Sequence, residues 1–225
     1  MTPSIRRLTA SAAFACVTLS LHAQASTLID FEGDAVTGLY FAGESFVQSG
    51  FQMSSLFDFA TVDTANGLGA SAPSGNSSQF YVQANDGELA ITRPDGGTFS
   101  LDGFSASFVP IDTQANPVTV IVAYGTHADN TQAGVAWNFA AAVNGVYPFA
   151  DYNTPADFSG FKNLTQLEFF SCSATAAGLC TVLVNNGAFA LDNVLLTAAV
   201  PEPTTGLMLA MGLLGLALVH RRAAR

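Results

Sequence analysis

The stretch TFSLDGFSASF (Thr98–Phe108) decides the fold class, because apolar side chains recur in it at every second position. The alternation starts at Phe99 and resumes, after Gly103, at Phe104. Successive side chains of a strand point to opposite faces, so the pattern predicts a strand with one buried face. Similar short runs of Phe, Val, Ile, Leu and Thr recur along the chain, separated by Gly, Asn, Asp and Pro, which indicates many short strands.

The other runs extend this pattern over most of the chain. The predicted strands are Thr27–Glu32, Phe51–Met53, Gln79–Gln83, Glu88–Thr92, Thr98–Phe108, Pro117–Gly125, Val135–Ala140, Leu164–Ser171, Thr181–Val184 and Phe189–Thr197. Eighteen Phe residues supply the bulky inward side chains that two facing sheets need. We therefore expect an all-β fold, a single β-sandwich of jelly-roll type over residues 26–199, with no helix in its core and a long surface loop over Asp63–Ser78.

The N-terminus has the three parts of a secretory signal peptide. Arg6 and Arg7 precede the apolar run Leu8–Leu21, and Ala23-Gln24-Ala25 gives the small-x-small pattern of a cleavage site. The sequence thus predicts a signal helix within residues 1–25, cleavage by signal peptidase between Ala25 and Ser26, and an exported core.

The C-terminal segment Val200–Arg225 contains a second apolar run. Thr204–His220 would span about 25 Å as a helix, the short limit for crossing a bilayer. Arg221 and Arg222 open the basic tail 221–225, which the positive-inside preference keeps on the cytoplasmic side. The pattern predicts a transmembrane helix over 204–220 that anchors the core outside the cytoplasm.

Pro201, Glu202 and Pro203 stand just ahead of this helix, where two prolines keep the backbone extended and open to a protease. The order Pro-Glu-Pro, apolar run and arginine cluster resembles the PEP-CTERM sorting signal of Gram-negative bacteria over residues 200–225. The resemblance implies that a membrane exosortase recognises Pro201-Glu202-Pro203 and removes the tail. The membrane anchor is then transient, and the core passes to the cell surface or the exopolysaccharide matrix.

The charge of the core excludes one class of partner. Only Arg93 and Lys162 are basic between Ser26 and Val200, whereas sixteen of the seventeen acidic residues lie there, which leaves a formal charge of −14. Such a surface repels phosphate backbones, so we expect no nucleic-acid binding.

Two cysteines remain after signal removal. Cys172 and Cys180 flank a loop of small residues in an exported chain, which predicts a disulfide between them. A metal site is the weaker alternative, because no further Cys and no nearby His completes a ligand set.

The sequence offers no recognisable catalytic motif. HExxH, GxSxG and Gly-rich phosphate loops are all missing. A Ser-His-Asp arrangement would have to use His127 with Asp129, where a solvated loop histidine is the simpler interpretation. A pair of carboxylates suited to glycoside hydrolysis stays open, since no spacing selects one. We predict no catalytic residues and no enzyme.

Acidic residues mark both ends of the core. Asp30, Glu32 and Asp34 alternate along the first predicted strand, so they would share one face of it. If the first and last strands are neighbours, Asp192 and Asn193 approach this row, and several convergent oxygens are what Ca²⁺ requires. The alternative is an exposed polar edge.

A Phe-Glu opening strand and the closing Phe-x-Leu-Asp-Asn-Val of Phe189–Val194 resemble the galactose-binding-like jelly rolls of carbohydrate-binding modules. The resemblance implies a structural Ca²⁺ between Glu32 and Asp192, with Asp30, Asp34 and Asn193 as further candidate ligands. It also implies an aromatic glycan platform, for which the single tryptophan, Trp137, is the candidate together with a tyrosine: Tyr124, Tyr147 or Tyr152. Burial of Trp137 among its apolar neighbours is the alternative.

Together these features predict an exported, exosortase-sorted protein of the cell surface or exopolysaccharide matrix, with a non-catalytic binding or matrix role. Its partners would be signal peptidase, exosortase, the membrane before processing, and exopolysaccharide. Two alternatives remain open: a secreted hydrolase of matrix polysaccharide, and a structural coat protein that self-associates through edge strands.

Overall fold

The computed structural model describes residues 24–85, 87–110, 119–174, 180–181 and 187–199, together with Gly212. Gln24–Val200 forms one compact unit. The predicted signal helix, the Pro-Glu-Pro motif, the predicted transmembrane helix and the basic tail lie outside the described residues, apart from Gly212. Within the described ranges, no helix is both long enough and apolar enough to cross a membrane.

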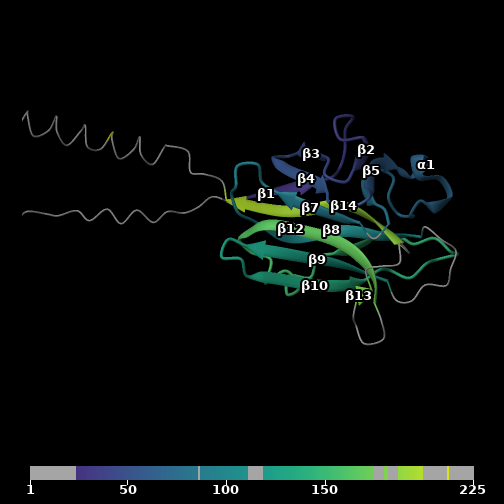
Figure 1. Ribbon diagram of the computed structural model, residues 1–225. Helices are drawn as coiled ribbons and strands as arrows, with labels where there is room; N and C mark the ends of the chain where they lie inside the picture. The colour runs from purple at the N-terminus through teal and green to yellow at the C-terminus, as the bar shows by residue number, and fades with distance from the viewer. Residues whose placement is uncertain are drawn as a thin grey trace, which may run out of the picture. The chain divides into compact units, whose positions relative to one another are not determined.

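The described strands form one continuous hydrogen-bonded network (Figure 1), which we divide into two antiparallel sheets where β8 and β12 pair at a single position. Sheet I runs β2 (Gly38–Phe41), β5 (Phe59–Thr64), β6 (Gln79–Gln83), β14 (Gly187–Ala199), β8 (Phe99–Pro110) and β11 (Ala150–Tyr152). Beyond the end of β6, β1 (Gln24–Ile29) pairs with the second half of β14. Sheet II runs β3 (Ser45–Gln48), β4 (Phe51–Ser55), β7 (Glu88–Thr92), β12 (Leu164–Ala174), β9 (Thr119–His127) and β10 (Gln132–Asn138), and β13 (Cys180–Thr181) pairs with β12.

The chain crosses repeatedly between the sheets, from β2 to β3, β4 to β5, β6 to β7 and β7 to β8. In the described ranges the two sheets share a single paired position, Phe99 with Leu164. Crossing connections of this kind and two facing sheets make a β-sandwich of jelly-roll type. The predicted all-β, single-sandwich fold is therefore confirmed.

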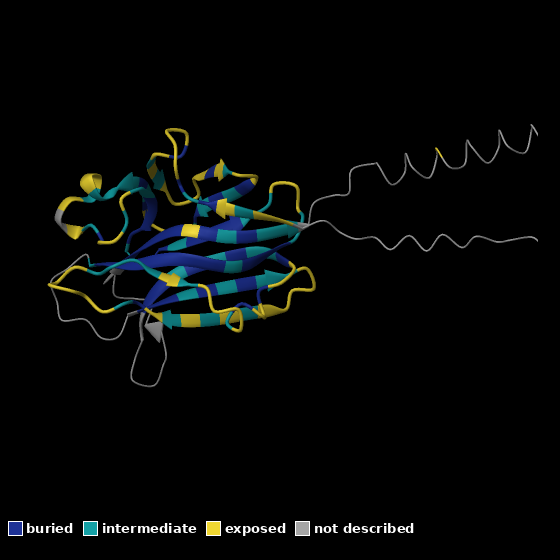
Figure 2. Ribbon diagram, turned by 180° about the vertical axis from the view of Figure 1, so that it is seen from behind, coloured by how far each residue is buried: buried dark blue, intermediate teal, exposed yellow. Residues whose placement is uncertain are grey.

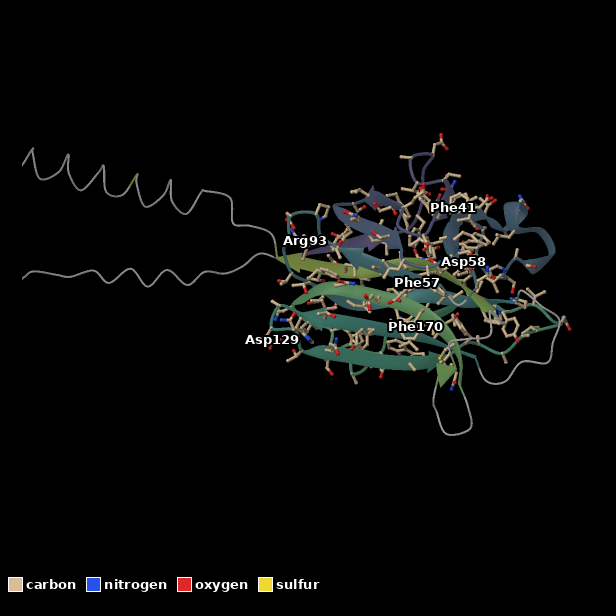
Figure 3. The ribbon with its side chains drawn as sticks, viewed as in Figure 1. Phe41, Phe57, Asp58, Arg93, Asp129 and Phe170 are labelled. Carbon is tan, nitrogen blue, oxygen red and sulfur yellow. The ribbon has the colours of Figure 1, made fainter. Side chains whose placement is uncertain are left out.

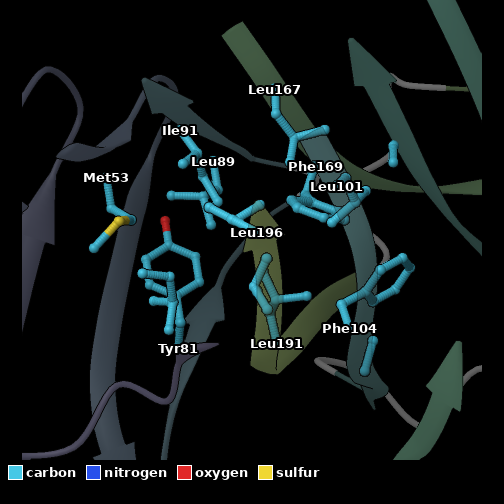
Figure 4. Packing of buried hydrophobic residues seen from close by; sticks show 14 of the residues in the cluster. Met53, Tyr81, Leu89, Ile91, Leu101, Phe104, Leu167, Phe169, Leu191 and Leu196 are labelled. Carbon is cyan, nitrogen blue, oxygen red and sulfur yellow. The ribbon is translucent and has the colours of Figure 1, made fainter. Parts of the chain in front are cut away.

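Aromatic rings fill the space between the sheets. Phe104 of β8 lies with its ring centroid 5.0 Å from that of Phe169 on β12, and Phe51 of β4 lies 5.3 Å from Phe99 of β8. Figure 4 shows the aliphatic part of the same layer, where leucines of β8 and β14 meet Leu89, Ile91 and Leu167 of sheet II. The many Phe residues thus serve as the inward-facing layer that the sequence predicted.

A bulge in β8 explains the interrupted alternation of its sequence. Leu196 of β14 pairs with Leu101, whereas its neighbour Leu195 pairs with Gly103, so Asp102 is an extra residue. One extra residue reverses the faces of all side chains beyond it. Consequently Leu101 and Phe104 both face the core. Gly103 is also closely approached, because a Cβ there would lie 3.1 Å from the Tyr152 carbonyl oxygen of β11.

A second bulge lies beside the first, in β14. Asp192 pairs with Ser105 and Leu195 pairs with Gly103, which leaves one extra residue in β14. Asn193 adopts a positive φ of 50° there. The inward parity changes across it, because Phe189 and Leu191 before the bulge and Val194 and Leu196 after it all belong to the core. Figure 2 shows the buried residues, in dark blue, concentrated in the central strands of the sandwich.

The first predicted strand, Thr27–Glu32, was placed three residues too late, because β1 covers Gln24–Ile29. β1 ends at Ile29, because Phe31 has a φ of 55° and Gly33 a φ of 100°, both incompatible with an extended strand. The sequence also missed β2, β3, β5, β11 and the short helix α1 (Ala65–Leu68). Of the predicted strand Thr181–Val184, only its first residue is described.

The N-terminal strand bears on signal removal. β1 already begins at Gln24, with Gln24 opposite Ala199 and Ala25 opposite Ala198. Cleavage before Ser26 stays a prediction; it would remove these two pairs and leave Ser26–Thr197 as the first one.

The predicted disulfide lies at the β12–β13 hairpin. Cys172 is buried on β12, and the backbone of Cys180 lies opposite Ala174. The side chain of Cys180 is outside the described residues, so the Cys172–Cys180 bond stays a prediction.

Candidate functional site

Asp192 is the centre of a polar cluster where β14 bulges. Its side chain is 1% exposed, although it carries a carboxylate. Asn76 Nδ2 donates to its Oδ2 at 2.6 Å, Ser78 Oγ donates to the same oxygen at 3.3 Å, and the Asn193 backbone N–H donates to its Oδ1 at 2.7 Å. These donors compensate part of the cost of burying the acid.

Two further groups complete this cluster, which we call the terminal acid cluster (Glu32, Asn76, Ser78, Gln79 and Asp192). Glu32 Oε1 accepts a hydrogen bond from the Gln79 backbone N–H at 2.9 Å. Burial raises the pKa of Asp192 to about 6; the donated hydrogen bonds oppose this shift, and the negative charge of Glu32 adds to it. Gln79 Oε1 is buried without a hydrogen-bond partner. The cluster is therefore rich in oxygen acceptors and short of positive charge.

The structure brings together only part of the predicted calcium set. β1 and β14 are neighbours, and Glu32 lies near enough to Asp192 to affect its pKa. The prediction that Asp30, Glu32 and Asp34 share one strand face is wrong, because all three lie beyond the end of β1. Asp30 instead accepts a hydrogen bond from Gln48 Nε2 at 2.9 Å.

The remaining candidates stand at the edge of the cluster. Asp34 is exposed in the turn after Gly33, and Asn193 is exposed while its Nδ2 donates to Asp192 Oδ2 at 3.3 Å. Among the described residues, no group of three or more His, Cys, Asp or Glu side chains is arranged to hold a metal. Any ion here would need amide or backbone oxygens besides Glu32 and Asp192.

The donor chemistry of the cluster nevertheless fits a hard cation. Carboxylate and amide oxygens are the ligands that Ca²⁺ prefers, and Glu32, Asp192 and the unpartnered Gln79 Oε1 supply them. Phe31, next to Glu32, adopts a φ of 55°, which a bulky residue rarely does, whereas the φ of 50° at Asn193, next to Asp192, is one that Asn tolerates. Local backbone strain of this kind gathers at functional sites.

A second polar region covers the outer surface of sheet II. Leu167 and Phe169 of β12 point into the core, so the alternating Gln166, Glu168 and Phe170 point outward. The register adds the outward residues of adjacent strands: Tyr124 of β9 lies opposite Glu168, and Glu88 of β7 lies opposite Phe170. We call these five residues, Tyr124, Gln166, Glu168, Phe170 and Glu88, the sheet II face; Figure 3 labels Phe170.

The two carboxyl groups of the sheet II face interact directly. Burial, the charge of Glu168 and a hydrogen bond with Glu168 together raise the pKa of Glu88 to about 7. Gln166 Nε2 donates to Glu168 Oε1. The raised pKa favours the protonated form of Glu88 beside Glu168, and two aromatic side chains, Tyr124 and Phe170, lie next to this pair in the strand register.

Sequence reasoning named Tyr124 but missed the other four residues of this face. The signal was present in Leu164–Ser171, where polar and apolar residues alternate. What could not be read from it is the pairing of β12 with β7 and β9, which brings Glu88 and Tyr124 beside it.

Trp137 packs as part of the aromatic core. It is half-buried, its ring stacks on Phe158 at 5.5 Å, and it meets Phe104 edge-on at 5.2 Å. Its Nε1 donates to Asp157 Oδ2 at 3.1 Å. These contacts hold the indole against other rings, and its predicted role as a glycan platform stays untested.

His127 is engaged on both sides of its ring. Nδ1 lies 3.0 Å from the Thr131 carbonyl oxygen, and Nε2 lies 3.0 Å from the Gly160 carbonyl oxygen. Asp129 instead accepts hydrogen bonds from the Thr131 backbone N–H and Oγ1. Neither ring nitrogen is left to activate a serine, so this geometry does not assemble a triad.

Comparison with known proteins identifies the tail. Residues 199–222 match the PEP-CTERM protein-sorting motif, which confirms the resemblance noted in the sequence. A comparison with curated proteins gave no significant match.

Three solved structures illustrate the similarity of the core. A DUF4465 family protein from Bacteroides caccae has 12% identity and a TM-score of 0.48, over 76% of this chain and 98% of that one. TmCBM61 in complex with β-1,4-galactotriose has 12% identity and a TM-score of 0.34, over 66% and 88%. A CBM22 xylan-binding domain from Paenibacillus barcinonensis has 8% identity and a TM-score of 0.34, over 80% and 99%.

The raised pKa of Glu88 predicts a pH-dependent stability. The folded protein keeps this proton up to about pH 7, whereas the unfolded chain releases it near the ordinary Glu value of 4.5. The folded state therefore binds more protons in this interval, and the free energy of unfolding should fall as the pH rises through it. Glu88→Gln should make the fall in melting temperature from pH 5 to pH 7 shallower, with Asp192 responsible for part of what remains.

Asp34→Asn, a change at an exposed acid outside both clusters, serves as the control and should retain the wild-type slope. Identical slopes in Glu88→Gln and wild type would contradict the role of the Glu88–Glu168 pair.

Proposed function

We propose that this chain is an exported, exosortase-sorted protein whose β-sandwich binds a polysaccharide of the cell surface or extracellular matrix of a Gram-negative bacterium without cleaving it. The sheet II face carries the binding part of the proposal, because it combines two aromatic rings with carboxyl and amide groups on one side of a rigid sheet.

The sorting part rests on the PEP-CTERM motif at residues 199–222. After cleavage before Ser26, Ala198 of β14 would still pair with Phe99 of β8. Pro201 follows three residues later in the sequence, so a protease could cut at the Pro-Glu-Pro segment without separating these paired strands.

Processing at both ends should be visible in the intact mass of the protein isolated from the cell surface and the medium. We expect a mass that begins at Ser26 and lacks the apolar run and basic tail, together with the loss of two hydrogen atoms for the Cys172–Cys180 disulfide. Replacing Pro201-Glu202-Pro203 by three alanines should leave the tail attached. An unprocessed C-terminus in the wild-type protein would contradict the sorting proposal.

Sugar recognition matches the chemistry of the sheet II face. The faces of Tyr124 and Phe170 can pack on the apolar C–H face of a sugar ring. Glu168, Glu88 and Gln166 offer acceptors, and one shared proton, for sugar hydroxyl groups. Binding sites of this type combine apolar contact area with a few placed polar groups.

A non-catalytic role is supported by the spacing of these acids. The carboxyl groups of a glycoside hydrolase stand about 5 Å or more apart, with room for the sugar or for water. Glu88 and Glu168 are instead hydrogen-bonded to each other. This arrangement suits binding better than acid–base or nucleophilic attack.

Removal of an aromatic ring from this face should weaken polysaccharide binding. Tyr124→Ala or Phe170→Ala should each reduce the affinity for exopolysaccharide from the host by about tenfold, because a stacked ring contributes roughly 1 kcal/mol or more. Tyr124→Phe keeps the ring and should retain most of the affinity. The measurement is calorimetric titration of the exported protein.

Val143→Ala removes an exposed apolar side chain outside the sheet II face and serves as the control. Unchanged affinity in both alanine variants, or breakdown of the polysaccharide that Glu168→Gln abolishes, would overturn this part of the proposal.

We further propose that the terminal acid cluster holds a structural Ca²⁺. Glu32 and Asp192 would supply carboxylate oxygens, with Gln79 Oε1 as a third donor. The bound ion would supply the positive charge that the buried Asp192 lacks, and so would favour its ionised form.

Calcium should therefore raise the melting temperature relative to a chelator. A ligand at about 100 times its Kd adds about 2.7 kcal/mol to the free energy of unfolding. Asp192→Asn should abolish the calcium-dependent difference, whereas Asp34→Asn should keep it. Equal melting temperatures of the wild-type protein with calcium and with chelator would show that no such site exists.

A further inference from the structure

An unusual group of exposed apolar side chains lies at one edge of sheet I. Leu39, Phe41, Phe57 and Phe59 are 53%, 56%, 60% and 37% exposed, and they make up half of the large exposed hydrophobic side chains among the described residues. We call these four residues the phenylalanine platform. Figure 3 shows Phe41 and Phe57 in the same part of the molecule, with Asp58 close by.

The strand register places two of these four residues opposite each other on neighbouring strands. Phe41 of β2 lies directly opposite Phe59 of β5, so their side chains share one face of sheet I. Leu39 stands two residues earlier on β2 and points to the same side. Phe57 belongs to the connection from β4 into β5. Apolar side chains gathered in this way on a surface mark an interaction site more often than single ones do.

A buried polar network fixes the backbone under the platform. Gln83 is fully buried, and its Nε2 donates to the carbonyl oxygens of Phe57 at 2.8 Å and Phe59 at 3.1 Å. Its Oε1 accepts from the hydroxyl of Tyr81, which is itself buried. The rings therefore project from an ordered segment, and a ligand would not have to pay for ordering its backbone.

Every charged side chain identified at the rim is acidic. Asp58 accepts a hydrogen bond from Asn85 Nδ2 at 2.8 Å, and Glu44 Oε2 accepts one from the Phe41 backbone N–H at 2.8 Å. The two basic residues of the core are engaged elsewhere, Arg93 with Asp95 and Lys162 with Asp102. With a formal charge of −14 between Ser26 and Val200, the platform disfavours an anionic ligand and favours a cationic one.

The edge of β2 is poorly suited to strand addition by a second copy of the chain. Glu44 occupies the Phe41 N–H, one of the donors that an added strand would need. A second copy would also bring Glu44 and Asp58 toward acids of the same kind. The faces of the rings, and not the backbone of β2, are left for a partner.

We propose that the phenylalanine platform is a second binding surface, which takes sugar rings bearing free amino groups from a polysaccharide. The rings stack on the apolar faces of the sugars, while Asp58 and Glu44 pair with the ammonium groups. This surface lies on sheet I and is separate from the sheet II face. A chain with both surfaces would cross-link polysaccharide strands and gain avidity from two weak contacts.

The test is a calorimetric titration of the exported protein with three probes, a glucosamine hexamer, an N-acetylglucosamine hexamer and an oligogalacturonate. We expect the cationic hexamer to bind more tightly than the neutral one and the anionic oligomer not to bind. Phe57→Ala and Phe41→Ala should each weaken binding of the glucosamine hexamer by about tenfold. Asp58→Asn should weaken it at low salt and have less effect at high salt, because screening reduces the charge term.

Val143→Ala, at a side chain that is 62% exposed, is the matched control and should bind as the wild type does. The inference is overturned if Phe57→Ala and Phe41→Ala bind the glucosamine hexamer as tightly as Val143→Ala, or if the neutral hexamer binds as tightly as the cationic one. It is also overturned if the protein forms dimers that Phe57→Ala dissociates, since a second copy would then occupy the platform.

The two surfaces fail separately. If Tyr124→Ala and Phe170→Ala weaken binding of the exopolysaccharide, while Phe57→Ala and Phe41→Ala leave binding of the glucosamine hexamer unchanged, the proposed function is kept and the platform is rejected. If Phe57→Ala and Phe41→Ala weaken binding of the glucosamine hexamer, while Tyr124→Ala and Phe170→Ala leave binding of the exopolysaccharide unchanged, the platform is kept and the sheet II face is rejected as the binding site.

Discussion

The long antiparallel pairing of β8 with β14, interrupted by a bulge in each strand, is the constraint on which the rest of the structure depends. It forms the centre of sheet I and sets the inward face of both strands. Each bulge adds one residue and reverses the side-chain parity, so apolar residues on either side of it still reach the same core. Without Asp102 and Asn193 as extra residues, half of each strand would turn its apolar side chains toward solvent.

The same constraint creates the terminal acid cluster. The bulge in β14 places Asp192 in a buried position, near which the segment after β1 contributes Glu32 and the segment before β6 contributes Asn76 and Ser78. Of the two proposed binding surfaces, the phenylalanine platform lies at the edge of sheet I and the other on sheet II. Both combine exposed or half-buried rings with acidic side chains, and both are carried by paired strands, which keep binding groups in fixed relative positions. Some of the acidic side chains of the chain therefore belong to the proposed binding surfaces, in addition to any contribution they make to solubility.

The sequence predicted strands well where the local pattern of alternating residues and turn formers agreed with the strand bounds that packing in the fold imposes. β6 and β7 have the predicted bounds, because alternating residues end at the turn formers around Asn85, which has the positive φ that such a turn needs. β2 and β3 were missed because four-residue strands give too little periodicity to recognise. Asp30, Glu32 and Asp34 do not share the predicted strand face, because Phe31 leaves the extended conformation, whereas a sequence pattern assumes that the strand continues.

The sequence by itself determined the all-β class, the sorting motif and the acidic charge, because each depends on local order or on composition. Only the tertiary structure decided which side chains meet. Glu88 lies near Glu168 because β7 pairs with β12, two strands far apart in the sequence. Phe41 lies opposite Phe59 because β2 pairs with β5, two strands whose sequence pattern did not predict them. Trp137, the candidate that the sequence singled out for sugar binding, packs among core rings. The four residues of the phenylalanine platform, which the sequence did not single out, are exposed on the surface. Register between strands, set by packing and by the two bulges, carries information that no single run of residues contains.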